Sequence, residues 1–240
     1  NGYGGGLLNT GTISAGAATI QQTNTNGAVS AIALTVGAYA TVPRIDVAGE
    51  ITSGSATTPG AISASVSGQG QGQAFAIFID QNANVPTIDV KAHGSITASV
   101  TTSTISPTAS IAPSASPFTL QSEAIGDQSG TLTTINNAGL IAALNTQLTP
   151  AVGAVVVSSA RAIDLVASNA SGIQINNSGT IEGDVLFGSV GNNDVLNVGN
   201  VGAGGTAANP VTGQLDSPNQ YAVIAATSTV EASGLAPITK

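Results

Sequence analysis

The sequence predicts an all-β protein folded as a right-handed parallel β-helix, also called a β-solenoid. Three observations support this fold class: a short motif recurs along the chain, the segments around it alternate apolar and polar residues, and the composition favours strands and turns. Recurrence of this kind is typical of proteins that stack one structural unit along an axis. We therefore expect a single elongated domain over residues 1–240.

The repeated motif is an apolar residue, a glycine four positions later, and a second apolar residue two positions after the glycine. Its glycines are 38, 45, 45, 40 and 55 residues apart, which predicts five to six irregular repeats of 38–55 residues. Each repeat is either one coil with long side loops or two shorter coils. The six copies are Leu7–Gly11–Ile13, Ile45–Gly49–Ile51, Val90–Gly94–Ile96, Ile135–Gly139–Ile141, Ile175–Gly179–Ile181 and Val230–Gly234–Ala236.

Short alternating stretches accompany the motif. In Ile45-Asp46-Val47 and Ile88-Asp89-Val90 the aliphatic side chains fall on one face and the polar one on the other, the period of a β-strand. The interior of such a coil is narrow, which agrees with the many Ala and Val residues and the 3% of aromatic residues.

In three copies an asparagine stands two residues before the glycine, at Asn9, Asn137 and Asn177. Glycine, and to a lesser degree asparagine, tolerates the positive φ angles that tight turns often require. We expect these turns to lie at one corner of successive coils, so that the asparagine amides hydrogen-bond to one another along the axis.

The composition also limits the function. Charged residues make up only 7% of the chain, against about 25% in ordinary soluble domains. The net charge is −8, and the four basic residues are scattered, so neither nucleic acid nor an anionic membrane is an expected partner. No apolar run approaches the roughly 18 residues of a membrane-spanning helix. We predict no membrane insertion by this segment.

Few residues have the chemistry of a metal or cofactor site. Cysteine is absent, which excludes disulfides and thiolate ligands, and His93, the single histidine, is expected in a surface turn. The segment 188–196 resembles the Gly/Asp nonapeptide that binds calcium between coils, but it occurs in one imperfect copy. Asp194 is therefore a weak calcium candidate, and we predict no metal site and no cofactor.

A cluster of carboxylates is the main catalytic candidate. Asp46, Glu50 and Asp89 lie near repeat motifs, with Arg44 and Lys91 beside them, and can be neighbours across coils. Some β-helices cleave polysaccharides and need such carboxylates. The same residues also fit outward positions that keep a weakly charged rod in solution, and we predict no catalytic residue and no enzyme.

Two segments interrupt the pattern and are expected to form extruded loops. Residues 101–117 are rich in Ser, Thr, Ala and Pro, and residues 197–220 are rich in Gly, Asn and Pro. Proline removes donors from a β-ladder, and loops on one side of a solenoid often carry recognition. Each loop is a spacer or a binding surface.

The ends of the stack are candidate self-association surfaces. The chain enters a repeat at Leu7 and closes with a repeat near residue 230, without an amphipathic helix to cap either end. Unpaired strand edges invite pairing with another chain, and a contact that does not close builds a filament. The candidate residues for head-to-tail association are Leu7, Leu8, Ile13, Val230 and Leu235.

One region resembles a known family. Residues 176–188 read NNSGTIEGDVLFG and residues 191–197 read GNNDVLN. They are similar to passenger domains of bacterial autotransporters, which repeat N-x-G-x-I and often carry G-D-V-x-F-G followed by G-N-D-x-L-N. The specific match covers about residues 173–200. The resemblance implies export across the outer membrane and display at, or release from, the cell surface.

These observations lead to two functional hypotheses. The first is an extracellular structural protein that associates with copies of itself, head to tail, into a surface filament or layer. The alternative is an adhesin passenger that binds a host cell, a neighbouring cell, or a cell-surface glycan or protein through its side loops. A polysaccharide-acting enzyme ranks third.

Overall fold

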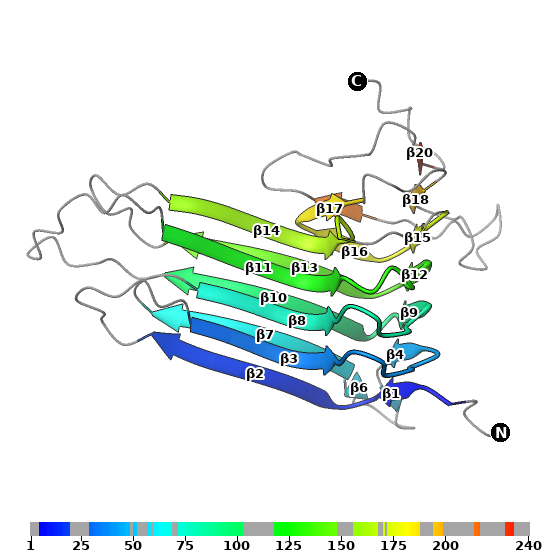
Figure 1. Cartoon of the computed structure of the whole chain (residues 1–240), viewed down its shortest axis with the longest axis horizontal. Coiled ribbons are helices and arrows are strands. Elements are labelled where there is room, and N and C mark those ends of the chain that lie inside the picture. Colours follow the sequence, from blue (N-terminus) through cyan, green and yellow to red (C-terminus); the bar gives the residue numbers. More distant parts are fainter. Residues whose placement is uncertain are drawn as a thin grey trace, which may run out of the picture.

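The fold is a stack of β-strands in three parallel sheets, which confirms the predicted parallel β-solenoid (Figure 1). Within the residues that this computed structural model describes, every regular element is a strand, and no helix is long and apolar enough to cross a membrane. The described residues are 5–19, 29–48, 50–51, 57–58, 60–68, 72–102, 118–147, 156–167, 170, 172–187, 194–198, 214–216 and 229–232.

The three sheets share the same neighbour order along the axis. Sheet A contains β1 (Leu7–Asn9), β4 (Ile45–Val47), β9 (Thr87–Val90), β12 (Thr134–Asn137), β15 (Gln174–Asn177), β18 (Val195–Val198) and β20 (Thr229–Ala232). Sheet B contains β2 (Thr12–Thr19), β7 (Gly60–Gly68), β10 (Gly94–Thr102), β13 (Leu140–Gln147), β16 (Thr180–Glu182) and β19 (Gln214–Asp216). Sheet C contains β3 (Val29–Val36), β8 (Gly72–Ile79), β11 (Phe118–Asp127), β14 (Val156–Asp164) and β17 (Asp184–Leu186).

Each of the first five coils takes one strand from each sheet, so one repeat is one coil. Sheet C ends at β17 and sheet B at β19, whereas sheet A continues to β20. The predicted 55-residue step contains an additional coil, because Leu196 of β18 pairs between Ile175 and Val230.

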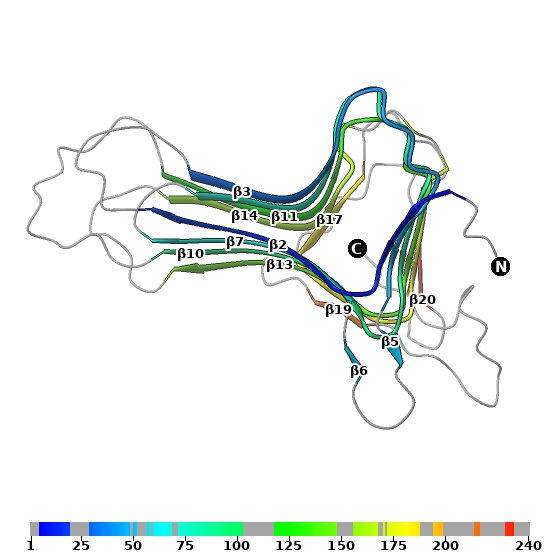
Figure 2. The same cartoon turned by 90° about the horizontal axis from the view of Figure 1, so that it is seen from below.

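Viewed along the axis, the molecule has a head and an arm (Figure 2). In the arm, sheets B and C run side by side; in the head they separate and sheet A closes the third side. The arm interior is lined by small residues such as Ala64, Ala98 and Ala74, whereas the head is filled by larger ones such as Ile88 and Leu132, all buried. Small side chains allow the two sheets of the arm to pack closely.

The interior repeats almost residue for residue. Parallel pairing places identical or similar side chains above one another, so each inward position forms a column along the axis. The sheet B column is Ile13, Ile62, Ile96, Ile141 and Ile181. The sheet A column is Leu7, Ile45, Ile88, Ile135, Ile175 and Leu196.

Sheet C bends at the same position in successive coils, which we call the elbow (Ala33, Ala76, Ala124 and Ala162). The ladder is interrupted there, since pairing passes from Ile32–Phe75 directly to Leu34–Ile77 and likewise in the next coils. In β8, Ala76 and the following Ile77 are both fully buried, so two consecutive side chains face inward. Two consecutive inward side chains interrupt the alternation of a regular strand, and each strand omits the same residue from the ladder, so the register is kept across the bend.

Two predicted repeat positions need correction. Ile88, and not Val90, occupies the sheet A column, whereas Val90 lies opposite Asn137. Gly60, and not Gly49, pairs with Gly94. The reason is an insertion in the second coil: β5 (Glu50–Ile51) and β6 (Thr57–Thr58) form an antiparallel hairpin that projects from the stack (Figure 2). Gly49 itself lies outside the described residues.

Strands overlap parts of both segments that were expected to form loops. Residues 101 and 102 belong to β10, and residues 103–117 lie outside the described part of the chain. Within residues 197–220, the first two belong to β18 and residues 214–216 form β19, and the other residues lie outside the description.

Candidate functional site

The repeat glycines lie where one coil contacts the next. A Cβ added at Gly94 would be 2.1 Å from the carbonyl oxygen of Val47, and one at Gly139 or Gly179 would be 2.2 Å from a carbonyl oxygen of the coil before. None of these glycines has a positive φ. Glycine is thus required by close backbone approach, and not by the turn conformation expected from the sequence. Gly11, in the first coil, has no atom within 4 Å of its added Cβ.

The corner asparagines are buried. Asn137 Nδ2 donates to Asn177 Oδ1 at 2.8 Å, and Asn137 Oδ1 accepts from the backbone N–H of Gly139 at 3.1 Å. Asn9 instead donates to the carbonyl oxygen of Ala61 at 2.9 Å, since Val47 occupies this position in the second coil. The amide ladder therefore joins two adjacent coils and does not run the length of the stack.

The outer face of sheet A brings together two of the three predicted carboxylates. Asp46 and Asp89 pair directly across β4 and β9 and are 2% and 6% exposed. Arg44 lies 2.5 Å from Asp46, and Lys91 lies 3.4 Å from Asp89. The side chain of the third, Glu50, is not among those described.

Burial is the main cause of a raised pKa at Asp46. The Lys91 ammonium lowers this pKa and the neighbouring Asp89 carboxylate raises it. Asp89 also accepts from Asn136 Nδ2 at 2.7 Å, and Asn136 accepts from Asn176 Nδ2 at 2.8 Å. The two carboxylates, the two cations and the amides of Asn136 and Asn176 form one polar cluster on the outer face of the stack.

Asp194, the weak calcium candidate, and His93, the single histidine, lie in other parts of the fold. Asp194 is buried, and one of its carboxylate oxygens accepts from the backbone N–H of Ile173 at 2.9 Å. His93 is exposed in the turn before β10. No group of three or more His, Cys, Asp or Glu side chains that could hold a metal ion occurs within the described residues.

The predicted self-association residues lie in strands at the edges of the sheets or outside the residues that the structure describes. Leu7 in β1 and Ile13 in β2 are partly buried against the core, whereas Leu8 is 47% exposed. Val230 lies in β20, opposite Leu196. Leu235 and the repeat glycine Gly234 lie outside the described residues.

A second pair of edges lies in the arm, away from both ends of the sequence. β13 pairs with β16 only over residues 140–142, and β14 pairs with β17 only over residues 161–164. On the side that faces β16 and β17, residues 143–147 and 156–160 therefore have no described strand beside them. We call these two segments the upper arm edge.

Asn145 closes the arm interior at this edge. In its column it follows Val66 and Val100, so a polar side chain replaces an apolar one at the last coil of the arm. Its Nδ2 lies 2.7 Å from the carbonyl oxygen of Ser159 in β14. This hydrogen bond joins sheet B to sheet C where the small-residue interior would otherwise meet solvent.

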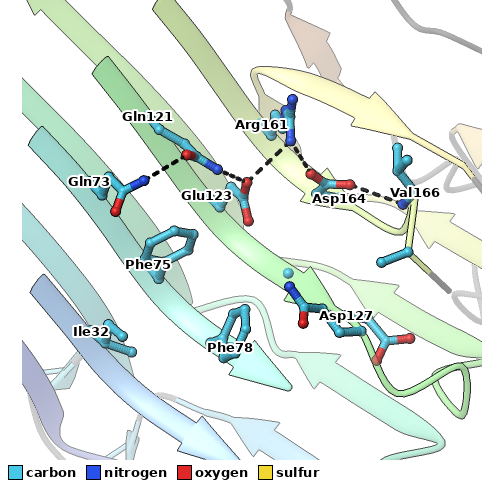
Figure 3. A pocket seen from close by; sticks show the side chains of 13 residues that line it. Ile32, Gln73, Phe75, Phe78, Gln121, Glu123, Asp127, Arg161, Asp164 and Val166 are labelled. Carbon is cyan, nitrogen blue, oxygen red and sulfur yellow. Dashed lines mark hydrogen bonds and ion pairs between the residues drawn. The ribbon is translucent and has the colours of Figure 1, made fainter. Parts of the chain in front are cut away.

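A groove lies on the outer face of sheet C beside the elbow (Figure 3). It has a volume of about 490 Å³ and crosses β3, β8, β11 and β14. One wall is apolar, with Ile32, Phe75 and Phe78. The other wall is polar, and its residues are Gln73, Gln121, Glu123, Asp127, Gln128, Arg161 and Asp164.

Five residues of the polar wall form one connected network, drawn with dashed lines in Figure 3, whereas Asp127 accepts from Ser129. Gln73 Nε2 donates to Gln121 Oε1 at 3.1 Å, and Gln121 Nε2 donates to Glu123 Oε1 at 2.5 Å. Arg161 Nη1 donates to the same Glu123 oxygen at 3.3 Å and also to Asp164. Each side chain fixes the next, so the wall is held in place before any ligand arrives.

Burial raises the pKa of Glu123, and the nearby Asp164 carboxylate raises it further. Its hydrogen bond from Gln121 and the charge of Arg161 act in the opposite direction. Arg161 donates to both carboxylates, Glu123 and Asp164.

Comparisons with protein-family models, with curated proteins and with solved structures found no match to this chain.

Proposed function

We propose that this protein is a structural β-solenoid subunit that associates with copies of itself through strand edges. The upper arm edge is the observation that carries the proposal. Two adjacent strands, one in each sheet of the arm, present five residues each without a described partner on that side. Unpaired backbone N–H and C=O groups of this kind bind another strand.

The upper arm edge also lacks the features that prevent such pairing. Natural edges are guarded by Lys, Pro or inward-pointing charges. Residues 143–147 read ALNTQ and residues 156–160 read VVSSA, without a charge or a proline. Leu144 is 44% exposed on the outer face of sheet B. Two upper arm edges can therefore pair through their backbone groups, and no charged side chains on them repel each other.

The shape of the stack favours a two-fold contact. Sheet A continues past the arm through β15, β18 and β20, so a second head cannot be placed directly above the first (Figure 1). A copy turned by 180°, with its head at the opposite end, avoids this overlap. Pairing is then antiparallel and centred near Asn145, which places Leu144 of one copy opposite Thr146 of the other.

A filament requires a second contact surface on the same subunit, in addition to the upper arm edge. An isologous contact alone gives a dimer, whereas two different contacts on one subunit give an open assembly. The outer sides of β2 and β3 are the second site, because each strand has eight uncharged residues and no described partner there. We therefore propose a filament or layer, in place of the strictly head-to-tail order that the sequence suggested.

We also propose an extracellular or bacterial cell-surface location. The proposal is supported by the resemblance of residues 173–200 to autotransporter passengers and by the absence of cysteine and methionine, the most easily oxidised residues. The adhesin alternative is supported by a different feature, the groove beside the elbow.

Lysine at the upper arm edge tests the self-association. In Leu144→Lys/Thr146→Lys, like charges face each other across the antiparallel seam and oppose pairing. We expect at least tenfold weaker self-association in light-scattering chromatography, and loss of assemblies in negative-stain electron microscopy over a concentration series.

A matched control lies in the same two columns, two coils earlier. Ser65→Lys/Ser67→Lys places the same charges on β7, which is paired on both sides, and should leave self-association unchanged. A wild-type protein that stays monomeric at every concentration contradicts the proposal. So does unchanged assembly of the Leu144/Thr146 variant.

A further inference from the structure

The groove beside the elbow has the composition of a ligand site. Its volume, about 490 Å³, falls within the roughly 300–1,000 Å³ of small-molecule sites, which combine apolar walls with a few fixed polar groups. The groove lies on the outer face of sheet C, whereas the upper arm edge consists of backbone groups between coils. The two features are therefore independent.

The apolar wall offers aromatic surface. The rings of Phe75 and Phe78 are 5.8 Å apart with an interplanar angle of 68°, an edge-to-face arrangement. Gly126 lies directly opposite Phe78 in the ladder, so no side chain from that position covers the ring. A Cβ there would be 2.8 Å from Glu123 Oε2, which shows how closely the polar wall approaches.

The polar wall offers donors and acceptors in alternation. Glutamine amides carry two N–H donors and an oxygen with two acceptor sites, and carboxylates and guanidinium groups have similar spare capacity. The network uses one of the two N–H groups of Gln121, and the Arg161 side chain is 33% exposed, so these two residues retain donors for a ligand, whereas Glu123 is buried. Hydroxyl groups, which both donate and accept, match such a wall.

The groove runs across the strands and therefore along the axis. Ile32, Phe75, Glu123 and Arg161 are paired in one column, with one residue from each of four successive coils. Neighbouring strands are about 4.8 Å apart. This spacing is close to the length of one pyranose unit in an extended polysaccharide, so one sugar can face each coil.

Charge decides between classes of glycan. Within the groove the carboxylates of Glu123, Asp127 and Asp164 outnumber the single cation, Arg161, which is already paired with two of them. The chain as a whole has a net charge of −8. A polyanionic glycan would be repelled and would find no unengaged cation in the groove.

We propose that this groove binds an extended, neutral glycan chain. Sugar rings pack on Phe75 and Phe78 through their C–H faces, and their hydroxyl groups hydrogen-bond to Gln121 and Arg161, which the buried Glu123 holds in place. The walls are preorganised, which lowers the entropy lost on binding. The protein then holds a polysaccharide along its axis.

Calorimetric titration with defined hexasaccharides tests the proposal. The probes are the neutral hexamers of β-1,4-glucan, β-1,3-glucan and β-1,4-mannan, the anionic hexamer of α-1,4-galacturonan and the cationic hexamer of β-1,4-glucosamine. We expect at least one neutral hexamer to bind, with at least tenfold weaker binding to Phe75→Ala and no binding of the anionic hexamer. Tyr39→Ala is the control, since it removes an 83%-exposed aromatic residue outside the groove.

Three results overturn the proposal. They are no binding of any neutral hexamer, equal binding by wild type and Phe75→Ala, and tighter binding of a charged hexamer than of every neutral one. Circular dichroism of each variant separates loss of the site from loss of the fold. The Leu144→Lys/Thr146→Lys variant should bind the hexamers as the wild type does, so glycan binding and self-association can fail separately.

Discussion

The inner and outer columns of this solenoid differ in how strictly they repeat. In sheet B the inward column is isoleucine in five successive coils. In sheet C the outward column beside the elbow changes in every coil, from Ile32 to Phe75, Glu123 and Arg161. Packing therefore dictates the inner residue, whereas the outer one is free to serve another purpose.

This difference shows where to look for function in a repeat protein. Stacked coils force each inward side chain to match the one above and below it, because the interior is close-packed. The outward positions have no such requirement. A column that combines aromatic, acidic and basic residues, in a chain with 3% aromatic and 7% charged residues, is therefore the best marker of a site.

The largest expected effect comes from breaking an inner column. Ile96 is fully buried in the third coil, between Ile62 and Ile141. Ile96→Ala should lower the free energy of unfolding by about 2–5 kcal/mol, the usual cost of the cavity and lost burial. Urea denaturation measures it, with the outward Ser99→Ala as control. A loss no larger than that of Ser99→Ala would show that the column is not tightly packed.

A smaller effect on stability, of opposite sign, is expected for alanine substitutions at two glycines that occupy the same position of the repeat. In Gly139→Ala the new Cβ meets a carbonyl oxygen at 2.2 Å, so the coils must separate, at a cost of about 1–3 kcal/mol. In Gly11→Ala nothing lies within 4 Å, and a less flexible unfolded chain should stabilise the protein by about 0.4–1 kcal/mol. Thermal unfolding of both variants checks the opposite signs. Equal changes in stability for the two variants would contradict the conclusion that close contact between coils requires glycine at position 139.

The smallest effect concerns an outer column and depends on pH. Because the folded state raises the pKa of Glu123 above its ordinary value of 4.5, it binds this proton more tightly than the unfolded state does. The group therefore contributes stability below pH 4.5 that is lost as pH rises through the folded pKa.

Glu123→Gln removes this titration and tests its sign. The free energy of unfolding of wild type minus that of Glu123→Gln should decrease between pH 4 and pH 8, and this subtraction cancels the raised pKa of Asp46. Denaturation at several pH values measures the difference. A constant or increasing difference would show that the paired charge of Arg161 outweighs burial.

Much of the fold could be predicted because the residues of the inner columns recur in the sequence as a recognisable pattern. The alternating aliphatic residues and the recurring glycines reflect the stacked interior directly. Gly49 was misassigned because Ile45–Gly49–Ile51 satisfies the same spacing, and only the pairing of Gly60 with Gly94 shows that the second coil contains a hairpin. A pattern of spacing cannot distinguish an insertion from a turn.

The groove could not be predicted from a motif, because its lining residues run from Ile32 to Ala167, 135 positions apart, and residues at the same position of successive coils differ in chemical type. A signal was nevertheless present. Phe75 and Phe78 are two of only four phenylalanines, and Arg161 is one of four basic residues. Rare residue types at outward strand positions deserve the same weight as recurring ones.

The alanine column of the elbow has a consequence for how such a protein changes length. Each coil contributes one small residue inside and one strand of groove outside, so curvature and groove grow together. Duplication of a coil would lengthen the groove by about 4.8 Å without redesigning the interior. For the glycan chain proposed above, the number of coils would then set the number of sugar units that the groove contacts.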